Sequence, residues 1–299
     1  TNDSTNEGNE TATIAVSGVS GGSASESGSQ SVTITITDDD NFSFSVADVT
    51  VAETAGSATI TVLMSSASGS STTIQYATSD ATATTAGSDY TQTNGTLTFS
   101  AGDQSETFTV SITDDSVYEG NETFTVTLSS QSAGSISDNE ATVTITENES
   151  APTVSLGASS TSVYDNGSNI TLTATSTQEA DEDITVVIGT SGSAAETSDY
   201  AEISNITISA GATTGTATFN PTEDTVNEGS ETATISISSV SGADSSTSGT
   251  TSVTITITEY ALRTATAFAD SGSDSVTSSS VASDAQYSNI DTHLVGSSV

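Results

Sequence analysis

The chain has 299 residues and carries 39 acidic side chains against a single Arg, which gives a formal net charge of −38. This balance excludes nucleic acid as a partner, because binding it needs Lys and Arg to displace counterions. It also disfavours contact with an anionic membrane surface, and no apolar run is long enough to predict membrane insertion. Cysteine is absent and His293 is the only histidine, which excludes sulfur and imidazole metal clusters and disfavours a Ser-His-Asp triad.

The apolar residues are few, at 32% of the chain, but they are not scattered. They alternate with Thr and Ser in short segments, among them 108–112, 124–128 and 255–257. Alternation of β-branched and aromatic residues with polar ones is typical of half-buried strands and argues against a disordered chain. The intervening segments are rich in Gly, Ser, Asp and Asn, which turns prefer. The sequence therefore predicts an all-β protein.

A motif of the form Asp-[Ser/Thr]-x-x-Glu-Gly-x-Glu-Thr occurs three times. It begins at Asp3, Asp115 and Asp224, at separations of 112 and 109 residues. Each copy is followed by a strand-like segment, a Ser/Gly-rich loop and a closing strand whose end carries acids. Such repetition indicates that the chain is built from copies of one folded unit.

The repeat divides the chain into four regions. Residues 41–149 and 150–259 each hold about seven short strands without helices, which predicts tandem immunoglobulin-like antiparallel β-sandwiches. Residues 1–40 match only the last third of such a domain, and two strands cannot bury a core alone. Residues 260–299 match nothing in the repeat and form a Ser-, Ala- and Asp-rich tail, which we interpret as an assembly segment. Because the chain begins TNDST, with neither an initiator Met nor a signal-like segment, we expect a processed or partial chain.

The acids of the region 41–149 fall at strand ends and in loops rather than on strand faces. They are Glu53, Asp89, Asp114, Asp115, Glu119, Glu122, Glu147 and Glu149. In a sandwich whose strands run up and down, these points can all meet at one end. Calcium takes about 6–8 oxygen ligands, and hard cations prefer the carboxylates that this chain offers. The eight acids supply enough oxygen atoms for more than one ion.

Two long segments of this region, with the acid-tipped closing strand, resemble the Calx-β domain family. They read AETAGSATITV (52–62) and AGSDYTQTNGTLTFSAGDQSETFTVSITDDSVYEGNETFTVTL (86–128). Tandem Calx-β repeats occur in the regulatory domains of sodium–calcium exchangers and in bacterial surface proteins. The resemblance implies a sandwich in which the eight acids named above ligate calcium, at the end that faces the next domain.

The resemblance also implies matching ligands in the other two copies. In residues 150–259 these are Asp165, Asp199, Glu223, Asp224, Glu228, Glu231 and Glu259. Glu223 replaces Asp114 there, and Tyr260 follows the closing strand without a second acid, so we expect fewer ions or weaker binding. In the partial first copy the matching acids are Asp3, Glu7, Glu10, Asp38, Asp39 and Asp40, without counterparts of Glu53 and Asp89.

Plainer interpretations of some features stay open. The acid clusters could be a solvated acidic surface, although clustering at repeat-equivalent points argues against it. The run EADED (179–183) has no counterpart in the middle region and is expected to be a solvated hairpin rather than a site. Tyr90 and Tyr200 are expected to pack rather than bind. A glycosidase-like role for Asp114 and Asp115 is disfavoured because the pair recurs in every copy and Trp is absent, so no enzyme activity is expected.

The sequence thus favours an extracellular structural protein, a calcium-rigidified array of sandwiches that forms a surface fibre or stalk. Calcium ions and either further copies of the chain or neighbouring repeats are the expected partners. Head-to-tail polymerisation by strand complementation would complete the first piece, which lacks strands that the tail of a neighbouring subunit could supply in part. The alternative is a spacer or binding region of a large calcium-dependent adhesin.

Overall fold

The computed structural model describes residues 3–28, 30–224, 226 and 228–260. The predicted assembly segment, residues 260–299, lies outside this part of the chain except for Tyr260. The described residues form strands joined by turns, with one short 3-10 helix, η1 (Glu53–Ala55). Among them, no helix has the length and apolar character needed to cross a membrane.

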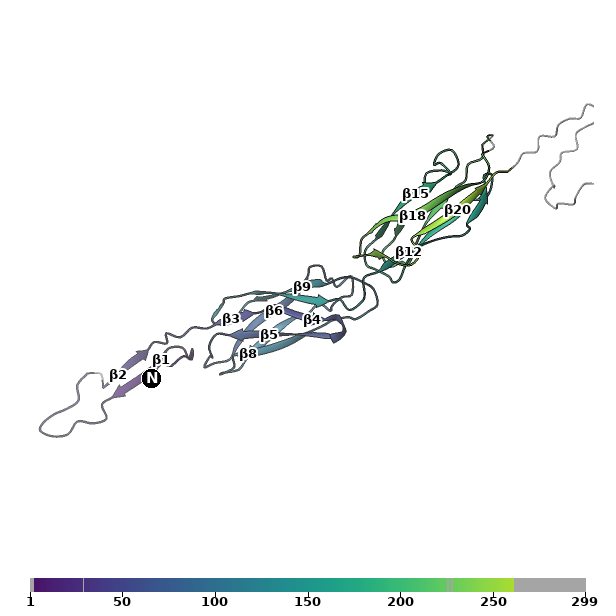
Figure 1. Cartoon of the computed structure of the whole chain (residues 1–299). Helices are drawn as coiled ribbons and strands as arrows, with labels where there is room; N and C mark the ends of the chain where they lie inside the picture. The colour runs from purple at the N-terminus through teal and green to yellow at the C-terminus, as the bar shows by residue number, and fades with distance from the viewer. Residues whose placement is uncertain (1–2, 29, 225, 227, 261–299) are drawn as a thin grey trace, which may run out of the picture. The chain divides into compact units, whose positions relative to one another are not determined.

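The first region forms a two-stranded antiparallel hairpin, in which β1 (Glu10–Ala15) pairs with β2 (Ser31–Ile36). Figure 1 shows the two strands with no third strand in their sheet. Their apolar side chains are exposed, since Ile14 is 61% and Val32 is 60% accessible. Two strands cannot enclose a core, so this hairpin presents an uncovered apolar face.

The second region folds into a sandwich of two sheets (Figure 1). Its strands are β3 (Ser43–Val46), β4 (Val49–Ala52), β5 (Ser57–Met64), β6 (Thr72–Asp80), β7 (Asn94–Phe99), β8 (Ser105–Ser111), β9 (Glu122–Ser129), β10 (Ser135–Ile136) and β11 (Glu140–Thr146). One sheet has the order β10-β3-β5-β8, and the other has the order β4-β11-β9-β6-β7.

Alternation of side chains along the strands builds the core of this sandwich. In β9, Phe124, Val126 and Leu128 are buried, while the threonines between them are only half-buried. In β8, Phe108 and Val110 are likewise buried between exposed neighbours. Successive strand residues point to opposite faces of a sheet, so a one-residue shift would expose every apolar side chain. Full burial of such a side chain contributes roughly 1.5–3 kcal/mol, and the pattern therefore determines the register.

Two buried tyrosines complete the cores beside the acidic ends. The ring of Tyr90 stacks on Phe124 with centroids 4.2 Å apart. The ring of Tyr200 stacks on Phe219 with centroids 4.9 Å apart. Both tyrosines are almost inaccessible to solvent, which confirms the prediction that they are packing residues.

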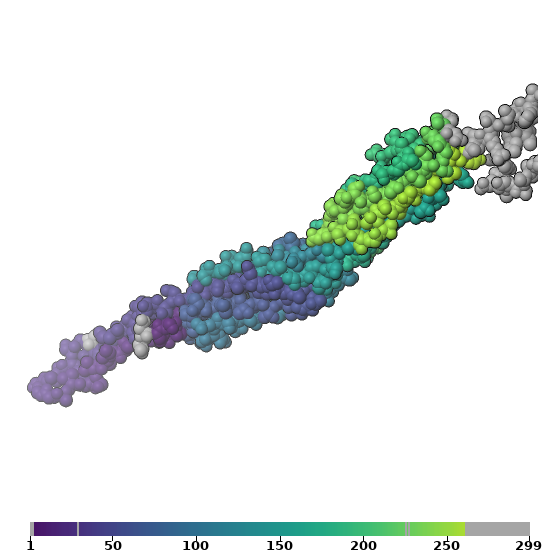
Figure 2. All heavy atoms as spheres, in the orientation of Figure 1, coloured from purple at the N-terminus to yellow at the C-terminus, as the bar shows by residue number. Residues whose placement is uncertain are grey.

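The third region repeats the architecture of the second. Its strands are β12 (Thr153–Ala158), β13 (Ser162–Tyr164), β14 (Ile170–Ser176), β15 (Ile184–Gly192), β16 (Ile206–Ile208), β17 (Thr214–Phe219), β18 (Glu231–Ser241), β19 (Ser246–Thr247) and β20 (Ser252–Thr258). The sheets have the orders β17-β14-β12-β19 and β13-β20-β18-β15-β16. Figure 2 shows residues of the late strands of this sandwich, green to yellow, on the viewed face.

The prediction of tandem all-β sandwiches is confirmed, with one refinement. Most neighbouring strands are antiparallel, but β4 pairs parallel with β11 and β3 pairs parallel with β10. The parallel pairs arise because the chain changes sheets between β3 and β4, so that β4 runs beside the closing strand in the same direction. The third sandwich has the same two parallel pairs, β13 with β20 and β12 with β19.

Candidate cation-binding site

The described residues of the repeated motif make the same turn in all three copies. In each loop, the first Asp accepts a hydrogen bond from the backbone N–H two residues later. The pairs are Asp3 with Thr5 at 2.9 Å, Asp115 with Val117 at 2.7 Å and Asp224 with Val226 at 2.7 Å. The motif glycine has a φ of +75° in the middle copy, at Gly120, and a similar value in the others. This left-handed conformation favours glycine and explains why the motif keeps it.

The carboxylate that follows each closing strand holds the other side of the loop. Glu147 Oε2 accepts hydrogen bonds from the N–H groups of Glu119 and Gly120, at 2.6 and 2.9 Å. In the first copy, Asp38 accepts from the two equivalent N–H groups. In the third copy, Glu259 accepts from one of them. Hydrogen bonds to an ionised acceptor are stronger than neutral ones, so this acid positions the loop and its carboxylates.

The middle sandwich brings six of its eight predicted ligands into two groups of three. The groups are Asp89 with Glu119 and Glu122, and Glu53 with Glu147 and Glu149. Within each group, the three residues offer oxygen atoms that lie within 4.8 Å of one another. Glu122 opens β9, Glu147 follows β11 and Glu53 opens η1, so strand ends of one sheet supply both groups.

Burial makes these carboxylates costly to leave without a counter-charge. Glu53 and Asp89 are only 5% and 8% accessible. Glu149 Oε2 is buried and has no hydrogen-bond partner among the described residues. A buried ionised oxygen without a partner is strongly unfavourable, and the chain has a single Lys or Arg to offset 39 acids. An all-oxygen set of this kind fits a hard divalent cation such as calcium.

Burial and mutual repulsion raise the pKa of three of these acids. Burial, followed by the charge of Glu147, raises the pKa of Glu53 to about 7. Burial, followed by the charge of Asp89, raises the pKa of Glu119 to about 8. Burial and a hydrogen bond with Asp89 raise the pKa of Glu122 to about 8. The three groups therefore hold protons near neutral pH when no cation replaces them.

Glu147 differs from these neighbours. Burial acts to raise its pKa, but N–H groups of Glu149, Glu119 and Gly120 donate to it and lower the pKa below its ordinary value. Its hydrogen bond with Glu149, together with burial, raises the pKa of the Glu149 carboxyl instead. Glu147 is thus the member of its group that stays ionised.

The two other predicted ligands of the middle sandwich, Asp114 and Asp115, lie outside both groups of three. One oxygen of Asp115 is occupied by the Val117 N–H. The charge of Asp115 nevertheless contributes to the raised pKa of Glu119, and the charge of Asp114 contributes to the raised pKa of Glu149. Both acids therefore add negative charge to the site from its border.

The third sandwich gathers Asp199, Glu228 and Glu231 within the same limit of 4.8 Å. Three more predicted ligands, Asp165, Asp224 and Glu259, line the same surface hollow. Glu223 is not among the residues that line it. One group of three is found there, where the middle sandwich has two, among the described residues of each.

Tyr260 alters the third site. Asp165 matches Glu53 in strand register, since β13 and β4 pair with the closing strands in the same way. Asp165 Oδ1 accepts the backbone N–H groups of Tyr260 and Asn166, at 2.8 and 2.9 Å, so the main chain occupies this oxygen in the third sandwich.

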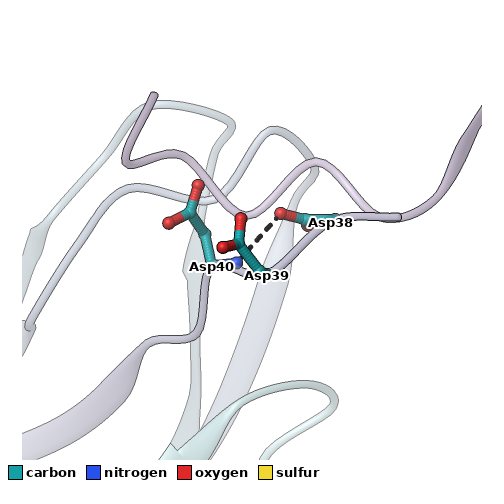
Figure 3. Close-up of side chains that lie close together, drawn as sticks. All are labelled: Asp38, Asp39 and Asp40. Carbon is teal, nitrogen blue, oxygen red and sulfur yellow. Dashed lines mark hydrogen bonds between the residues drawn. The ribbon is translucent and has the colours of Figure 1, made fainter. Parts of the chain in front are cut away.

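The first copy brings its acids together beside a sheet of only two strands among the described residues. One hollow is lined by all six predicted ligands, Asp3, Glu7, Glu10, Asp38, Asp39 and Asp40. Figure 3 shows the last three side by side, with the Asp40 N–H bonded to Asp38 Oδ1 at 3.1 Å. Hydrogen bonds from the Asp40 and Gly8 N–H groups lower the pKa of Asp38, whereas burial and then the charge of Asp39 raise that of Asp40.

Two residues beside the middle acids lie outside the predicted set, Asp181 and Tyr118. The Asp181 charge contributes to the raised pKa of Glu119 and Glu122, and its N–H donates to the Tyr118 carbonyl at 3.2 Å. The run 179–183 has exposed acids, as expected, but the expectation that it is only a solvated hairpin is wrong. Its main chain contacts the middle sandwich, which a comparison of sequence copies could not indicate.

The geometry defines a class of protein, tandem β-sandwiches that carry carboxylate clusters at repeat-equivalent domain ends. A family model described as Calx-beta domain matches residues 35–149 and again 147–260. The chain therefore belongs to the Calx-beta family, and the resemblance seen in the sequence is confirmed.

Solved structures of Calx domains are among the similar proteins. The apo-form Calx CBD1 domain is 27% identical, with a TM-score of 0.35, and the match covers 36% of this chain and 99% of that chain. CBD12 from CALX1.2 is 18% identical, with a TM-score of 0.36, over 73% of this chain and 99% of that chain. The calcium binding domain CBD12 of CALX1.1 is also 18% identical, with a TM-score of 0.36, over 72% and 99%. A comparison with curated proteins gives no match.

Proposed function

We propose that this chain is an extracellular structural protein whose tandem Calx-β sandwiches are rigidified by calcium in a surface fibre or stalk. The observation that supports this most directly is repetition of the acid-bearing loop, with its carboxylates, at the same end of each copy. Solubility alone requires only that charge be spread over the surface. It gives no reason to place three carboxylates with oxygen atoms within 4.8 Å of one another in two sandwiches. No catalytic role is assigned.

The two groups of the middle sandwich would hold the ions. Glu53 and Asp89 supply buried oxygens, while Glu119 and Glu122 supply carboxylates that lose their protons when a cation binds. Glu147 positions the loop through the N–H groups that it accepts. Calcium would supply the positive charge that the chain lacks. Because only the folded sandwich offers this arrangement, binding stabilises the folded state by mass action.

Isothermal titration of the calcium-free full chain tests the site. We expect saturable calcium binding that is weakened by Glu122→Gln, because Glu122 offers an oxygen to its group. The matched control is Glu106→Gln on β8, an acid that belongs to none of the groups of three. Wild-type protein that shows no heat of binding at millimolar calcium would contradict the proposal, as would equal effects of the two substitutions.

Assembly is supported by the uncovered hairpin. By the repeated motif, β1 and β2 correspond to β9 and β11, which are flanked in the middle sandwich by β6 and β4. Neither outer edge of the hairpin is paired within the described residues. Strands from a neighbouring subunit or neighbouring repeat would cover this face by β-augmentation. Electron microscopy with calcium should then show end-to-end particles, and uniformly single particles at high concentration would contradict assembly.

The alternative role is a spacer or binding region of a calcium-dependent adhesin. It keeps the same calcium sites and differs only in having a ligand. Glycan-array binding by the full chain would favour it over the purely structural role.

A further inference from the structure

The acid-bearing loop of the middle sandwich also contacts the third sandwich. The Tyr118 N–H donates to the Glu179 carbonyl at 3.0 Å, and the Asp181 N–H donates to the Tyr118 carbonyl at 3.2 Å. These two bonds form an isolated parallel β-bridge between Tyr118 and Ala180. The side chain joins in, because the Tyr118 hydroxyl donates to Asp244 Oδ2 at 2.9 Å. Tyr118 is 9% accessible and belongs to the apolar core cluster of the third sandwich.

The first copy makes the same main-chain contact with the middle sandwich. Asn6 occupies the Tyr118 position of the motif. The Asn6 N–H donates to the Ala67 carbonyl at 3.2 Å, and the Gly69 N–H donates to the Asn6 carbonyl at 2.7 Å. The result is again an isolated parallel β-bridge, here between Asn6 and Ser68.

The receiving loops are equivalent as well. Ser68 follows β5 and Ala180 follows β14, the corresponding strands of the two sandwiches. The Ser68 carbonyl accepts the Gly102 N–H at 2.9 Å, and the Ala180 carbonyl accepts the Gly211 N–H at 2.8 Å. Both bridging residues are small and buried. The same main-chain contact, with equivalent donors and acceptors, therefore occurs at both joints between copies.

The two contacts differ in the central side chain. The Tyr118 ring enters the core of the sandwich that follows. The Asn6 side chain instead donates to the Asp40 carbonyl in the connecting segment, at 2.5 Å. A buried aromatic ring removes far more apolar surface from water than a short amide does, so the Tyr118 contact gains stabilisation that the Asn6 contact lacks.

We propose that the motif loop docks on the Calx-β sandwich that follows it, at the small buried residue with which it forms the β-bridge, Ser68 or Ala180. The side chain at the position of Asn6 and Tyr118 determines how firmly this sandwich is held. Because the bonds are made by the main chain, the contact can form with different side chains, such as Asn6 and Tyr118, as in other strand additions. The proposal goes beyond the calcium-dependent function, because neither the bridge nor the Tyr118 ring includes a carboxylate of the two groups of three.

Spin labels across the second joint test the proposal in the full chain. The chain has no cysteine, so Thr109→Cys on β8 and Thr216→Cys on β17, both exposed, place one label on each sandwich. Distances are measured by double electron–electron resonance, in calcium and in chelator. In calcium, we expect one narrow distance in the otherwise unaltered chain. Tyr118→Asn, which installs the side chain of the first joint, should lose that narrow distance in both conditions.

Two further variants separate the contribution of the Tyr118 ring from that of its hydroxyl group and from any general effect of removing a tyrosine. Tyr118→Phe keeps the ring and removes only the bond to Asp244, so most of the narrow distribution should remain. Tyr164→Asn removes an exposed tyrosine of β13 and should change nothing. A distribution for Tyr118→Asn as narrow as that of the unaltered chain would overturn the proposal. So would a Tyr118→Asn distribution that broadens in chelator but stays as narrow in calcium as that of the unaltered chain, because the cation rather than the side chain would then hold the joint.

A measurement that leaves Tyr118 unchanged tests the proposal even if the Tyr118→Asn variant misfolds. Labels at Thr11→Cys on β1 and Thr109→Cys report the first joint. We expect a broader distance there than across the second joint. An equally narrow first joint would overturn the role of the side chain. Calcium titration of the same samples is a separate readout, so failure of calcium binding and failure of the docking contact give different results.

Discussion

At the scale of single residues, the surroundings of each carboxylate decide whether it keeps its charge. Glu147 accepts hydrogen bonds from four backbone N–H groups, and those from Glu149, Glu119 and Gly120 lower its pKa against the effect of burial. Glu119 and Glu122 face other carboxylates and have pKa values of about 8. The same residue type is therefore a fixed anion at one position and a group that exchanges its proton for a cation at another.

The raised pKa values predict how stability depends on pH when calcium is absent. Unfolded Glu titrates near 4.5, whereas Glu119 and Glu122 titrate near 8 in the folded protein. Between these values the folded state holds more protons, so the free energy of unfolding falls as pH rises. Urea unfolding in chelator should show this decline from about pH 5 to about pH 8, and Glu122→Gln should reduce the slope. Stability that is flat or rising across this window would contradict the assignment.

Glu147→Gln tests the residue that positions the loop. The substitution keeps an oxygen acceptor for the N–H groups but removes the permanent charge, so the fold should persist. We expect the calcium affinity to fall by about tenfold or more, measured by isothermal titration. Glu140→Gln, an exposed change at the start of β11, the strand that Glu147 follows, is the control and should leave the affinity unchanged. Equal affinities for both variants would show that Glu147 has no part in the site.

At the scale of elements, the same hairpin appears in three copies with different surroundings. Val126 in β9 is fully buried by the rest of its sandwich, whereas Ile14, at the matching position of β1, is 61% accessible. The strand itself forms in both cases, because alternation and β-branched residues favour it locally. What differs is the set of strands that covers it.

A matched pair of substitutions measures this difference. Val126→Ala should lower the free energy of unfolding of the middle sandwich by about 2 kcal/mol, through lost burial and a residual cavity. Ile14→Ala should change stability by no more than about 0.5 kcal/mol while the hairpin stays uncovered. Chemical denaturation of the full chain gives both values. A large cost for Ile14→Ala that appears only at high protein concentration would show that another subunit covers the hairpin, as the assembly proposal requires.

The sequence was sufficient to predict the strands and to predict which acids lie close together in most cases, for identifiable reasons. Alternation of apolar and polar residues indicates which side chains of a strand are buried, so the core positions of β8 and β9 could be predicted from the sequence. The repeated motif aligned Asp3, Asp115 and Asp224 without any structure. The sheet change between β3 and β4 and the contacts of Tyr118 depend on segments far apart in the chain, and no local pattern reports them. Glu223 resembles a ligand in alignment, yet it does not line the hollow of its sandwich.

At the scale of the whole molecule, a formal charge of −38 opposes compact folding unless cations offset it. The repulsion is concentrated where carboxylates cluster, at the acid-bearing ends of the copies. Those ends also carry the loops that bridge to the next sandwich, at Asn6 and at Tyr118. Neutralisation of the clusters would therefore act on the folded sandwiches and on the segments between them together.

Thermal unfolding of the full chain in calcium, in magnesium and in chelator tests this account most directly. At a calcium concentration 100 times the dissociation constant, one site adds about 2.7 kcal/mol to the folded state. The melting temperature should therefore rise by several degrees in calcium and by much less in magnesium, which dehydrates reluctantly and demands a stricter geometry. The same melting temperature in calcium and in chelator would contradict the claim that calcium binds and stabilises these sandwiches.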